Sequence, residues 1–434
     1  MEPVRIQIFP GVWLTALQSD KFKTGCMSIS LLTQLDKDTA SMNAIIPSVL
    51  RRGTRYHPDM QSISLACHEL YGSGIEPVVR KIGEIQCVGF YASFPDDKYL
   101  PAGSGVFEKA AGLCCEMLLS PNTKGGLFLP EYVESEKEKL LELIRSRIND
   151  KRSYAIGRLR ETMCCYEDYA VSRYGTEESA ENIYYTKLTK HYRTLLAESP
   201  VEIFYCGSLS AQRVQSVLTD ALCAMPRGNI NYELGTDIRM NAVEEKVRSF
   251  EERLSVAQAQ LCLGFRLGDC MEEPDIAAIN VFNAVFGGSV TSKLFMNVRE
   301  KLSLCYYAGS AADMHKGILL VSSGVDEEKL DAARAEILLQ LDAIRNGEVT
   351  EEELSAAKRF LASDLRACLD SQGELEGFTL SNTIDGLEMT PDELAALVED
   401  VRLADVVAVA RSVVPDAEYI LRGNGEEESD DDAM

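Results

Sequence analysis

The histidines of this sequence are too few and too widely spaced to bind a metal ion together. They stand at positions His57, His68, His191 and His315. No two of them have the i, i+3 or i, i+4 spacing that places two imidazoles on one face of a helix. His68-Glu69 is therefore expected to have a surface or helix-end role. The Glu- and Lys-rich stretch 131–147 is typical of a solvated helical face with i, i+3 ion pairs, rather than of a carboxylate metal site.

The 13 cysteines also lack a metal-binding or disulfide pattern. Their number is odd, Cys114-Cys115 and Cys164-Cys165 are adjacent, and no Cys-x-x-Cys occurs. Most have apolar neighbours, so we expect buried thiols that pack as small hydrophobic side chains in a reducing compartment. The N-terminus does not resemble a signal peptide, and no apolar run approaches the roughly 20 residues that span a bilayer. A cytoplasmic protein is predicted.

The net charge of −24 argues against nucleic acid and anionic membranes as partners. Six of the negative charges lie in residues 426–434, which we expect to form a disordered acidic tail. The acidity would suit a chamber that receives basic peptides, although solubility alone is the simpler explanation.

The predicted strands and helices, which must position any site, follow the same order in the two halves of the chain. Each half reads as strands, two helices, two more strands, several helices and a closing strand. Gly53 and Gly287, which follow the first helix of each half, are 234 residues apart, as are Gly72 and Tyr306. We therefore predict an α+β fold of two homologous domains, each a mixed, antiparallel-rich sheet with helices on one face. The expected boundaries are 1–225 and 244–425, with a linker at 226–243.

The most specific motif lies in the second half, from Gly287 to Tyr307, and reads Gly-Gly-Ser-Val-Thr-Ser-Lys-Leu-Phe-Met-Asn-Val-Arg-Glu-Lys-Leu-Ser-Leu-Cys-Tyr-Tyr. It resembles the signature of insulinase/pitrilysin-type zinc metallopeptidases, in the bacterial processing-peptidase branch. In the first half, Leu50-Arg-Arg-Gly-Thr54 resembles the stretch that follows the zinc helix of that family. The resemblance covers essentially the whole chain and implies two domains arranged as a clamshell.

Active members of that family carry His-x-x-Glu-His, in which two imidazoles bind zinc and the glutamate is the general base. Aligned on Gly53-Thr54, these positions hold Ala44, Pro47 and Ser48, and the distal zinc-binding glutamate falls on Leu143. None of these side chains is a good zinc ligand or a base. The resemblance thus implies no metal and no cofactor on this chain.

A second group of family residues is retained. Arg299 and Tyr306 have the seven-residue spacing of the arginine and tyrosine that contact the substrate backbone and the oxyanion in the family. The alternative is a surface arginine paired with Glu300 or Asp313, and a core tyrosine. Tyr307 would take the role of Tyr306 if the register slips by one residue.

The resemblance implies a non-catalytic subunit that pairs with a zinc-bearing paralogue and contacts a peptide or an unfolded protein. It is similar to the zinc-less member of a bacterial pair associated with elongation factor P modification. An alternative is a structural or peptide-binding scaffold without a proteolytic role, like the respiratory-complex subunits of this fold. A peptidase that works without zinc, or with unusual ligands, is the third and least favoured hypothesis.

Overall fold

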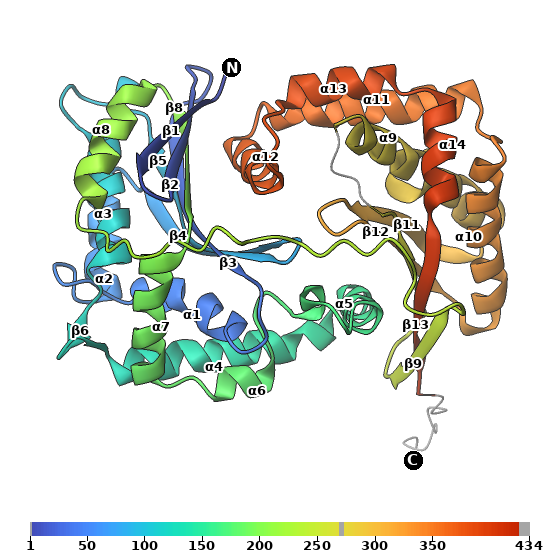
Figure 1. Cartoon of the computed structure of the whole chain (residues 1–434), viewed down its shortest axis with the longest axis horizontal. Helices are drawn as coiled ribbons and strands as arrows, with labels where there is room; N and C mark the ends of the chain where they lie inside the picture. Colours follow the sequence, from blue (N-terminus) through green and yellow to red (C-terminus); the bar gives the residue numbers. More distant parts are fainter. Residues whose placement is uncertain (1, 269–272, 425–434) are drawn as a thin grey trace, which may run out of the picture. The chain divides into compact units, whose positions relative to one another are not determined.

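The computed structural model describes residues 2–268 and 273–424, which form two compact units, each built around its own sheet (Figure 1). The first unit takes the chain up to Arg145, then Val171–Thr236 and Cys368–Glu388. The second takes Ser146–Ala170, Asp237–Ala367 and the chain from Met389 onward. Each unit therefore includes a segment from the other half of the sequence. The acidic tail expected at 426–434 lies outside the described residues.

The first unit contains a six-stranded sheet in the order β1-β2-β8-β3-β5-β4. Only β2 and β8 run parallel to each other. The strands are β1 (Val4–Phe9), β2 (Val12–Gln18), β3 (Thr24–Gln34), β4 (Gly74–Ile82), β5 (Ile85–Pro95) and β8 (Val201–Gly207). A separate small hairpin consists of β6 (Thr123–Lys124) and β7 (Leu127–Phe128).

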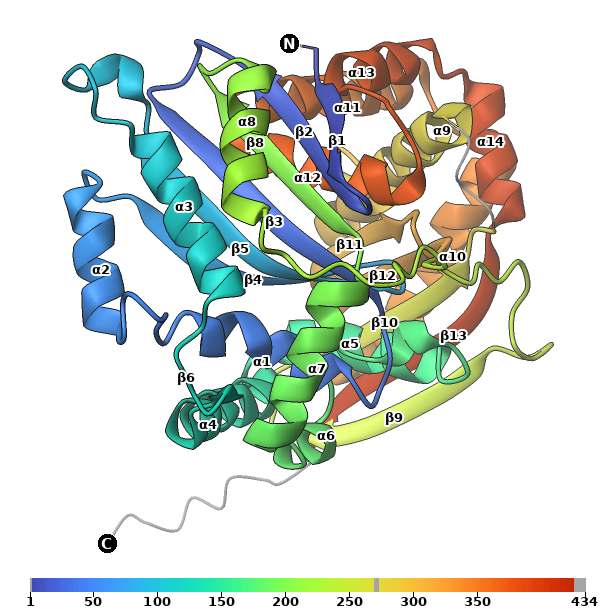
Figure 2. The ribbon, with the colours of Figure 1, turned by 60° about the vertical axis from the view of Figure 1, so that its left-hand side comes forward.

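Helices of the first unit cover both faces of its sheet. The large apolar core lies on one face, under α1, α3, α7 and α8 (Figure 2). On the other face, Leu375 of α12 packs against Leu17, Cys26, Phe204 and Cys206. The helices are α1 (Ala40–Leu50), α2 (Met60–Glu69), α3 (Val106–Leu119), α4 (Pro130–Ser146), α6 (Glu177–Glu181), α7 (Tyr185–Glu198), α8 (Ala211–Leu222) and α12 (Gln372–Asp385).

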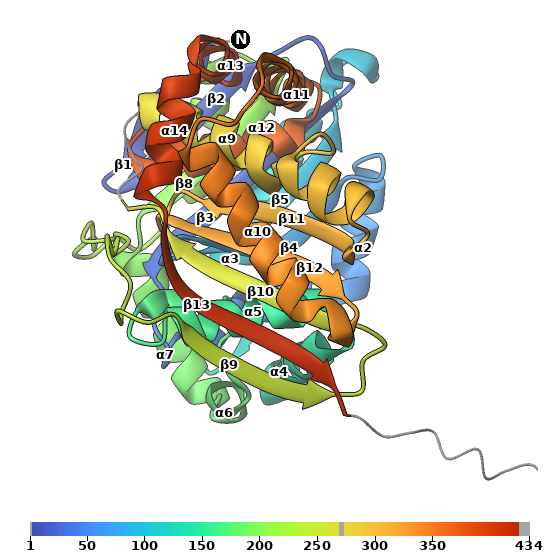
Figure 3. The same ribbon diagram turned by 90° about the vertical axis from the view of Figure 1, so that its right-hand side faces the viewer.

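The second unit contains a five-stranded sheet in the order β11-β12-β10-β13-β9, in which only β13 and β9 are parallel. Helix α10 lies across one face (Figure 3), and α5 packs on the opposite face through Ala155, Leu159 and Met163. The strands are β9 (Arg248–Leu254), β10 (Ala259–Arg266), β11 (Cys305–Asp313), β12 (Ile318–Val325) and β13 (Val414–Gly423). The helices are α5 (Lys151–Met163), α9 (Glu273–Asn283), α10 (Leu330–Arg345), α11 (Glu351–Cys368), α13 (Pro391–Asp400) and α14 (Leu403–Ser412), with π-helical segments at Ala284–Gly288 and Leu294–Lys301.

The two sheets share one connectivity. Strands β2-β8-β3-β5-β4 of the first unit correspond to β9-β13-β10-β12-β11 of the second, with the single parallel pair in the same place. The predicted α+β class with two mixed, antiparallel-rich sheets is confirmed. The clamshell arrangement of the two domains stays a prediction.

Each sheet has helices on both faces, whereas helices were expected on one face only. Strands β10 and β12 are buried at every residue, so both of their faces need an apolar cover. Helix α5 supplies the second cover in the second unit, and α12 does so in the first. Since these helices come from the opposite halves of the chain, the units differ from the contiguous ranges 1–225 and 244–425.

The expected linker is divided between the units. Arg227 donates to the carbonyl oxygens of Leu196 and Ser199, both at 2.8 Å, and Gly235 bonds to Gln34. Residues from Asp237 onward belong to the second unit. Among the residues that the structure describes, no helix is long and apolar enough to cross a membrane.

Candidate functional site

The positions at which the sequence resemblance predicts the family's zinc motif lie on α1, where they are mostly enclosed by the core. Ala44 and Pro47 are buried and Ser48 is half-buried. Pro47 has no backbone N–H, so the carbonyl of Asn43 loses its usual helical partner within α1. The position of the general base therefore holds a residue that can neither accept nor donate a proton.

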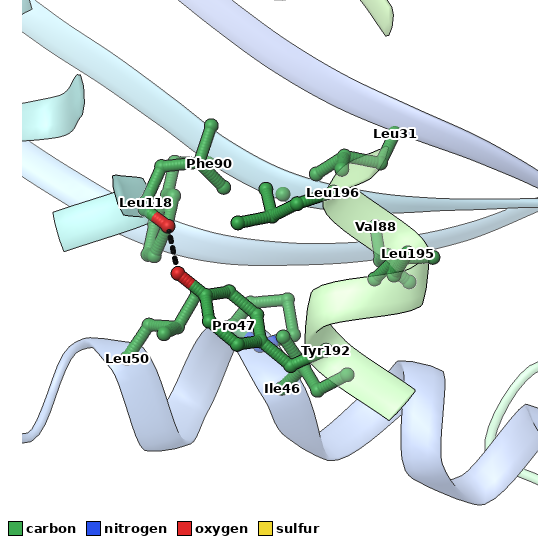
Figure 4. Close-up of a pocket in the computed structure, with 11 residues that line it drawn as sticks. Leu31, Ile46, Pro47, Leu50, Val88, Phe90, Leu118, Tyr192, Leu195 and Leu196 are labelled. Atoms are coloured by element: carbon green, nitrogen blue, oxygen red, sulfur yellow. Dashed lines mark hydrogen bonds between the residues drawn. The ribbon is translucent and has the colours of Figure 1, made fainter. Parts of the chain in front are cut away.

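Pro47 faces a small apolar pocket rather than a polar site (Figure 4). Its neighbours there include Val88 and Phe90 of β5 and Leu195 of α7. The hydroxyl of Tyr192 points to the carbonyl oxygen of Leu118 and donates to it at 2.6 Å. A carboxylate at this position would be placed in apolar surroundings that disfavour its ionised form.

The distal position, Leu143, lies on α4 and is 43% exposed. Two turns earlier on the same helical face, Glu136 accepts a hydrogen bond from Arg52 at 3.3 Å and another from Lys139 at 2.7 Å. Arg52 follows Ser48 by four residues and Ala44 by eight. The charge of Arg52 would oppose metal binding at the positions that the resemblance assigns to the zinc motif.

Arg52 is a residue to which the sequence analysis gave no role. Its spacing of four and eight residues from Ser48 and Ala44 can be read from the sequence, but its contact with Glu136 of α4 depends on the fold. Within residues 2–268 and 273–424, no group of three or more His, Cys, Asp or Glu side chains could hold a metal ion.

Two of the histidines have structural partners instead. His57 Nδ1 lies 2.8 Å from Glu116 Oε1. His191 Nε2 lies 2.6 Å from Asn43 Oδ1, and burial lowers the pKa of His191. The cysteines in the described part of the chain carry free thiols, most of them buried, as predicted. Burial raises the pKa of Cys87 and of Cys115 to about 12, which keeps these thiols protonated and unreactive.

Arg299 lies in the π-helical segment Leu294–Lys301, is half-buried and forms an ion pair with Glu300, one of the two alternative partners. Its guanidinium lies 4.7 Å from the centre of the Phe295 ring, and its Nε is 3.6 Å from Glu300 Oε1, beyond hydrogen-bond distance. The side chain is 41% exposed. The alternative partner, Asp313, instead accepts a hydrogen bond from Tyr169 at 2.5 Å.

Tyr306 lies near the start of β11, at an irregularity of its pairing with β12. Cys305 pairs with Val325 and Tyr307 with Gly324, so Tyr306 is the extra residue of a β-bulge. Its side chain is not in the core: the residue is 56% exposed, and its hydroxyl donates to Asp326 Oδ1 at 3.2 Å. The next residue, Tyr307, is half-buried.

Comparisons with known proteins show which family the chain belongs to. Residues 182–361 match the family described as the peptidase M16 inactive domain. The probable inactive metalloprotease YmfF of Bacillus subtilis (strain 168) is 30% identical over 415 residues, which cover 95% of this chain and 96% of that protein. The chain belongs to the M16 metallopeptidase family. The match to the inactive domain and to YmfF supports a zinc-less member of this insulinase family, as the sequence predicts.

Solved structures show the same fold over the whole length of this M16 homologue. A conserved protein from Enterococcus faecalis V583 has a TM-score of 0.88 at 27% identity, and the match covers 99% of this chain and 100% of that chain. The peptidase M16 inactive domain from Pseudomonas fluorescens has a TM-score of 0.80 at 17% identity, with 98% of each chain covered. The second likeness shows the fold alone.

Proposed function

We propose that this chain is the non-catalytic subunit of a peptide-processing heterodimer, in which a zinc-bearing M16 paralogue supplies the metal and the general base. The observation that supports the proposal is that the zinc motif is lost while the substrate-contacting residues are kept. By the sequence register, Ala44, Pro47 and Ser48 replace the zinc motif, whereas Arg299 and Tyr306 keep their spacing; Tyr306 is exposed and the side chain of Arg299 is 41% exposed.

The two retained side chains suit the contacts that a peptide would need. A guanidinium presents N–H donors in a fixed plane and can bind one or two peptide carbonyl oxygens. A phenol hydroxyl can donate to the oxyanion that develops when a peptide carbonyl is attacked. The hydroxyl of Tyr306 is held by Asp326, which is itself bound to Lys329 at 3.1 Å. The exposure of Tyr306 leaves its side chain accessible to a peptide, which supports the proposal.

The proposal includes a cytoplasmic setting and a peptide or unfolded-protein substrate. The association with elongation factor P modification rests on the sequence resemblance alone. The scaffold alternative requires neither a zinc-bearing partner nor a role for Arg299 and Tyr306, so the presence of a partner distinguishes the two.

Purification of the tagged full chain from its own cells tests the proposal. We expect a zinc-bearing M16 paralogue to co-purify in a 1:1 ratio, with about one zinc per pair and peptidase activity in the same fraction. A chain that is isolated alone, without partner or metal, would contradict the proposal and favour the scaffold. Stoichiometric zinc in the separated chain would overturn the assignment of the metal to the partner.

A further inference from the structure

Beside Tyr306, the ring of Tyr307 lies across strand β12 of the second unit. The register places Tyr307, Gly324 and Gln260 in one row over three neighbouring strands. The hydroxyl of Tyr307 donates to Gln260 Oε1 at 2.5 Å, on the far side of β12. The ring therefore spans the strand between them.

Gly324 is what allows the ring to lie there. A Cβ atom at this position would be 2.6 Å from Cε1 of Tyr307 and 3.0 Å from its Cδ1. Both distances are too short for carbon atoms, so any side chain at position 324 would displace the ring. One face of the Tyr307 ring is thereby fixed against the backbone of β12.

The guanidinium of Arg152 covers the Tyr307 ring. Its Cζ lies 4.0 Å from the ring centre, within the range of a cation–π contact. Arg152 is on the first turn of α5, and this helix is held to the sheet by Tyr154, whose hydroxyl donates to Glu252 at 2.9 Å. The arrangement is a stack of backbone, ring and guanidinium, which fixes the plane of the arginine.

The donors of Arg152 are not used within the described residues. Its side chain is exposed and makes no hydrogen bond or ion pair there. The nearest acid in sequence, Asp150, accepts hydrogen bonds from Ser153 at 3.1 and 2.6 Å. These bonds lower the pKa of Asp150 more than the charge of Arg152 does. The N–H groups of Arg152 therefore face solvent.

We propose that Arg152 is a specificity-determining residue that binds a carboxylate of the peptide next to Arg299 and Tyr306. This inference rests on the proposed function. Tyr307, which carries the stacked ring, directly follows Tyr306, the residue proposed to contact the substrate. The Cα atoms of these two residues are therefore about 3.8 Å apart. A guanidinium held in one plane, with free N–H donors, matches a carboxylate in a two-point contact. The carboxylate is an acidic side chain or the C-terminus of the peptide.

Binding of short fluorescein-labelled peptides to the full chain tests this inference. The probes are a peptide with one Glu and a free C-terminus, its Gln counterpart and its C-terminal amide. We expect the wild-type chain to bind the peptide with Glu and a free C-terminus at least about tenfold more tightly than one of the two others, the Gln peptide or the amide. The weaker binder of these two shows whether Arg152 binds the side chain or the C-terminus. Arg152→Gln should abolish the preference.

Control variants separate the charge of Arg152 from its neighbours. Arg160→Gln removes an exposed arginine from the same helix and should keep the preference. Tyr307→Phe retains the ring face and should keep it as well. In Gly324→Ala the displaced Tyr307 ring no longer supports Arg152. The preference for the carboxylate probe should therefore fall, even though Arg152 and the probe keep their charges.

The outcomes distinguish this inference from the proposed function. If Arg299→Ala weakens binding of all the probes but Arg152→Gln leaves the preference intact, the inference is wrong and the proposed function stands. If Arg299→Ala has no effect either, or if the wild-type chain binds none of the probes, both are contradicted.

Discussion

Replacement of Glu167 by Gln should destabilise the second unit strongly. The carboxylate of Glu167 is almost fully buried and accepts hydrogen bonds from Arg266 at 2.7 and 3.1 Å, while Lys316 Nζ lies 2.7 Å away. Arg266 and Lys316 have no exposed side-chain surface. Asp416 is the second buried acid of the cluster, and it also binds Arg266 and Arg248, each at 2.7 Å. Without the charge of Glu167, the buried cations Arg266 and Lys316 would lose a carboxylate partner, and Asp416 would remain as the partner of both Arg266 and Arg248.

Loss of one partner from a buried ion pair costs about 3–5 kcal/mol, because the remaining charge stays buried. In units of this size, each kcal/mol corresponds to a fall in Tm of about 2–4 °C. Glu167→Gln should therefore lower the Tm of the second unit by about 6–20 °C. The segment 146–170, which bears Glu167, should also be destabilised. The contacts of Glu167 with Arg266 and Lys316 bind this segment to β10 and to the turn that precedes β12.

Differential scanning calorimetry and urea unfolding measure this effect. Glu161→Gln is the matched control, since it removes the same charge from the same segment but from a partly exposed pair with Arg158. It should cost no more than about 1 kcal/mol. If the free energy of unfolding of Glu167→Gln lies within about 1 kcal/mol of the wild-type value, the reasoning is refuted.

The same contact has a pH dependence with a definite sign. Burial disfavours the charged form of Glu167, but the hydrogen bonds and charges of Arg266 and Lys316 outweigh burial and lower its pKa. The stabilisation is therefore present above the ordinary glutamate pKa of about 4.3 and is lost as the pH falls below it.

Three further predictions concern other parts of the chain. Gly324→Ala should destabilise the chain by about 1–3 kcal/mol through the clash with Tyr307, as measured by urea unfolding, whereas Gly373→Ala, with open space around it, should not. Because burial lowers the pKa of His191, stability should fall as the pH drops below about 6.5, and this part of the decline should be absent in His191→Asn. A chelator should leave the Tm of the separated chain unchanged, and a shift beyond the error of the scan would reveal a metal site.

Much of the fold could be predicted from the sequence because its elements follow simple periodicities. The order of strands and helices in each half predicts the α+β class that the structure shows. Strand β9 carries a weak sequence signal, because its residues alternate only between half-buried and exposed, with charges on both sides. Helix α12 also carries a weak signal, because it begins with the polar sequence Gln-Gly-Glu-Leu-Glu-Gly, which contains two glycines.

The site could be predicted only as far as spacing carries information. The spacing from Gly53-Thr54 predicts the lost zinc motif at Ala44, Pro47 and Ser48, and the seven-residue interval predicts the roles of Arg299 and Tyr306; both stay predictions. The spacing could not show the bulge at Tyr306, or that Tyr306 is exposed while Tyr307 is half-buried. Nor could it show the stack of Arg152 on Tyr307, which joins residues 155 positions apart through the packing of α5 on the sheet.

The peptidase rate of the purified heterodimer with Arg299→Ala in this chain tests the central claim most directly. Loss of a donor that stabilises the transition state lowers the rate by about a hundredfold or more. We predict a loss of this size with unchanged zinc content, unchanged assembly and an unchanged Tm, while Arg366→Ala, an exposed arginine on α11, keeps the wild-type rate. An Arg299→Ala pair that cleaves peptide at the wild-type rate would contradict the claim that this chain supplies part of the active site.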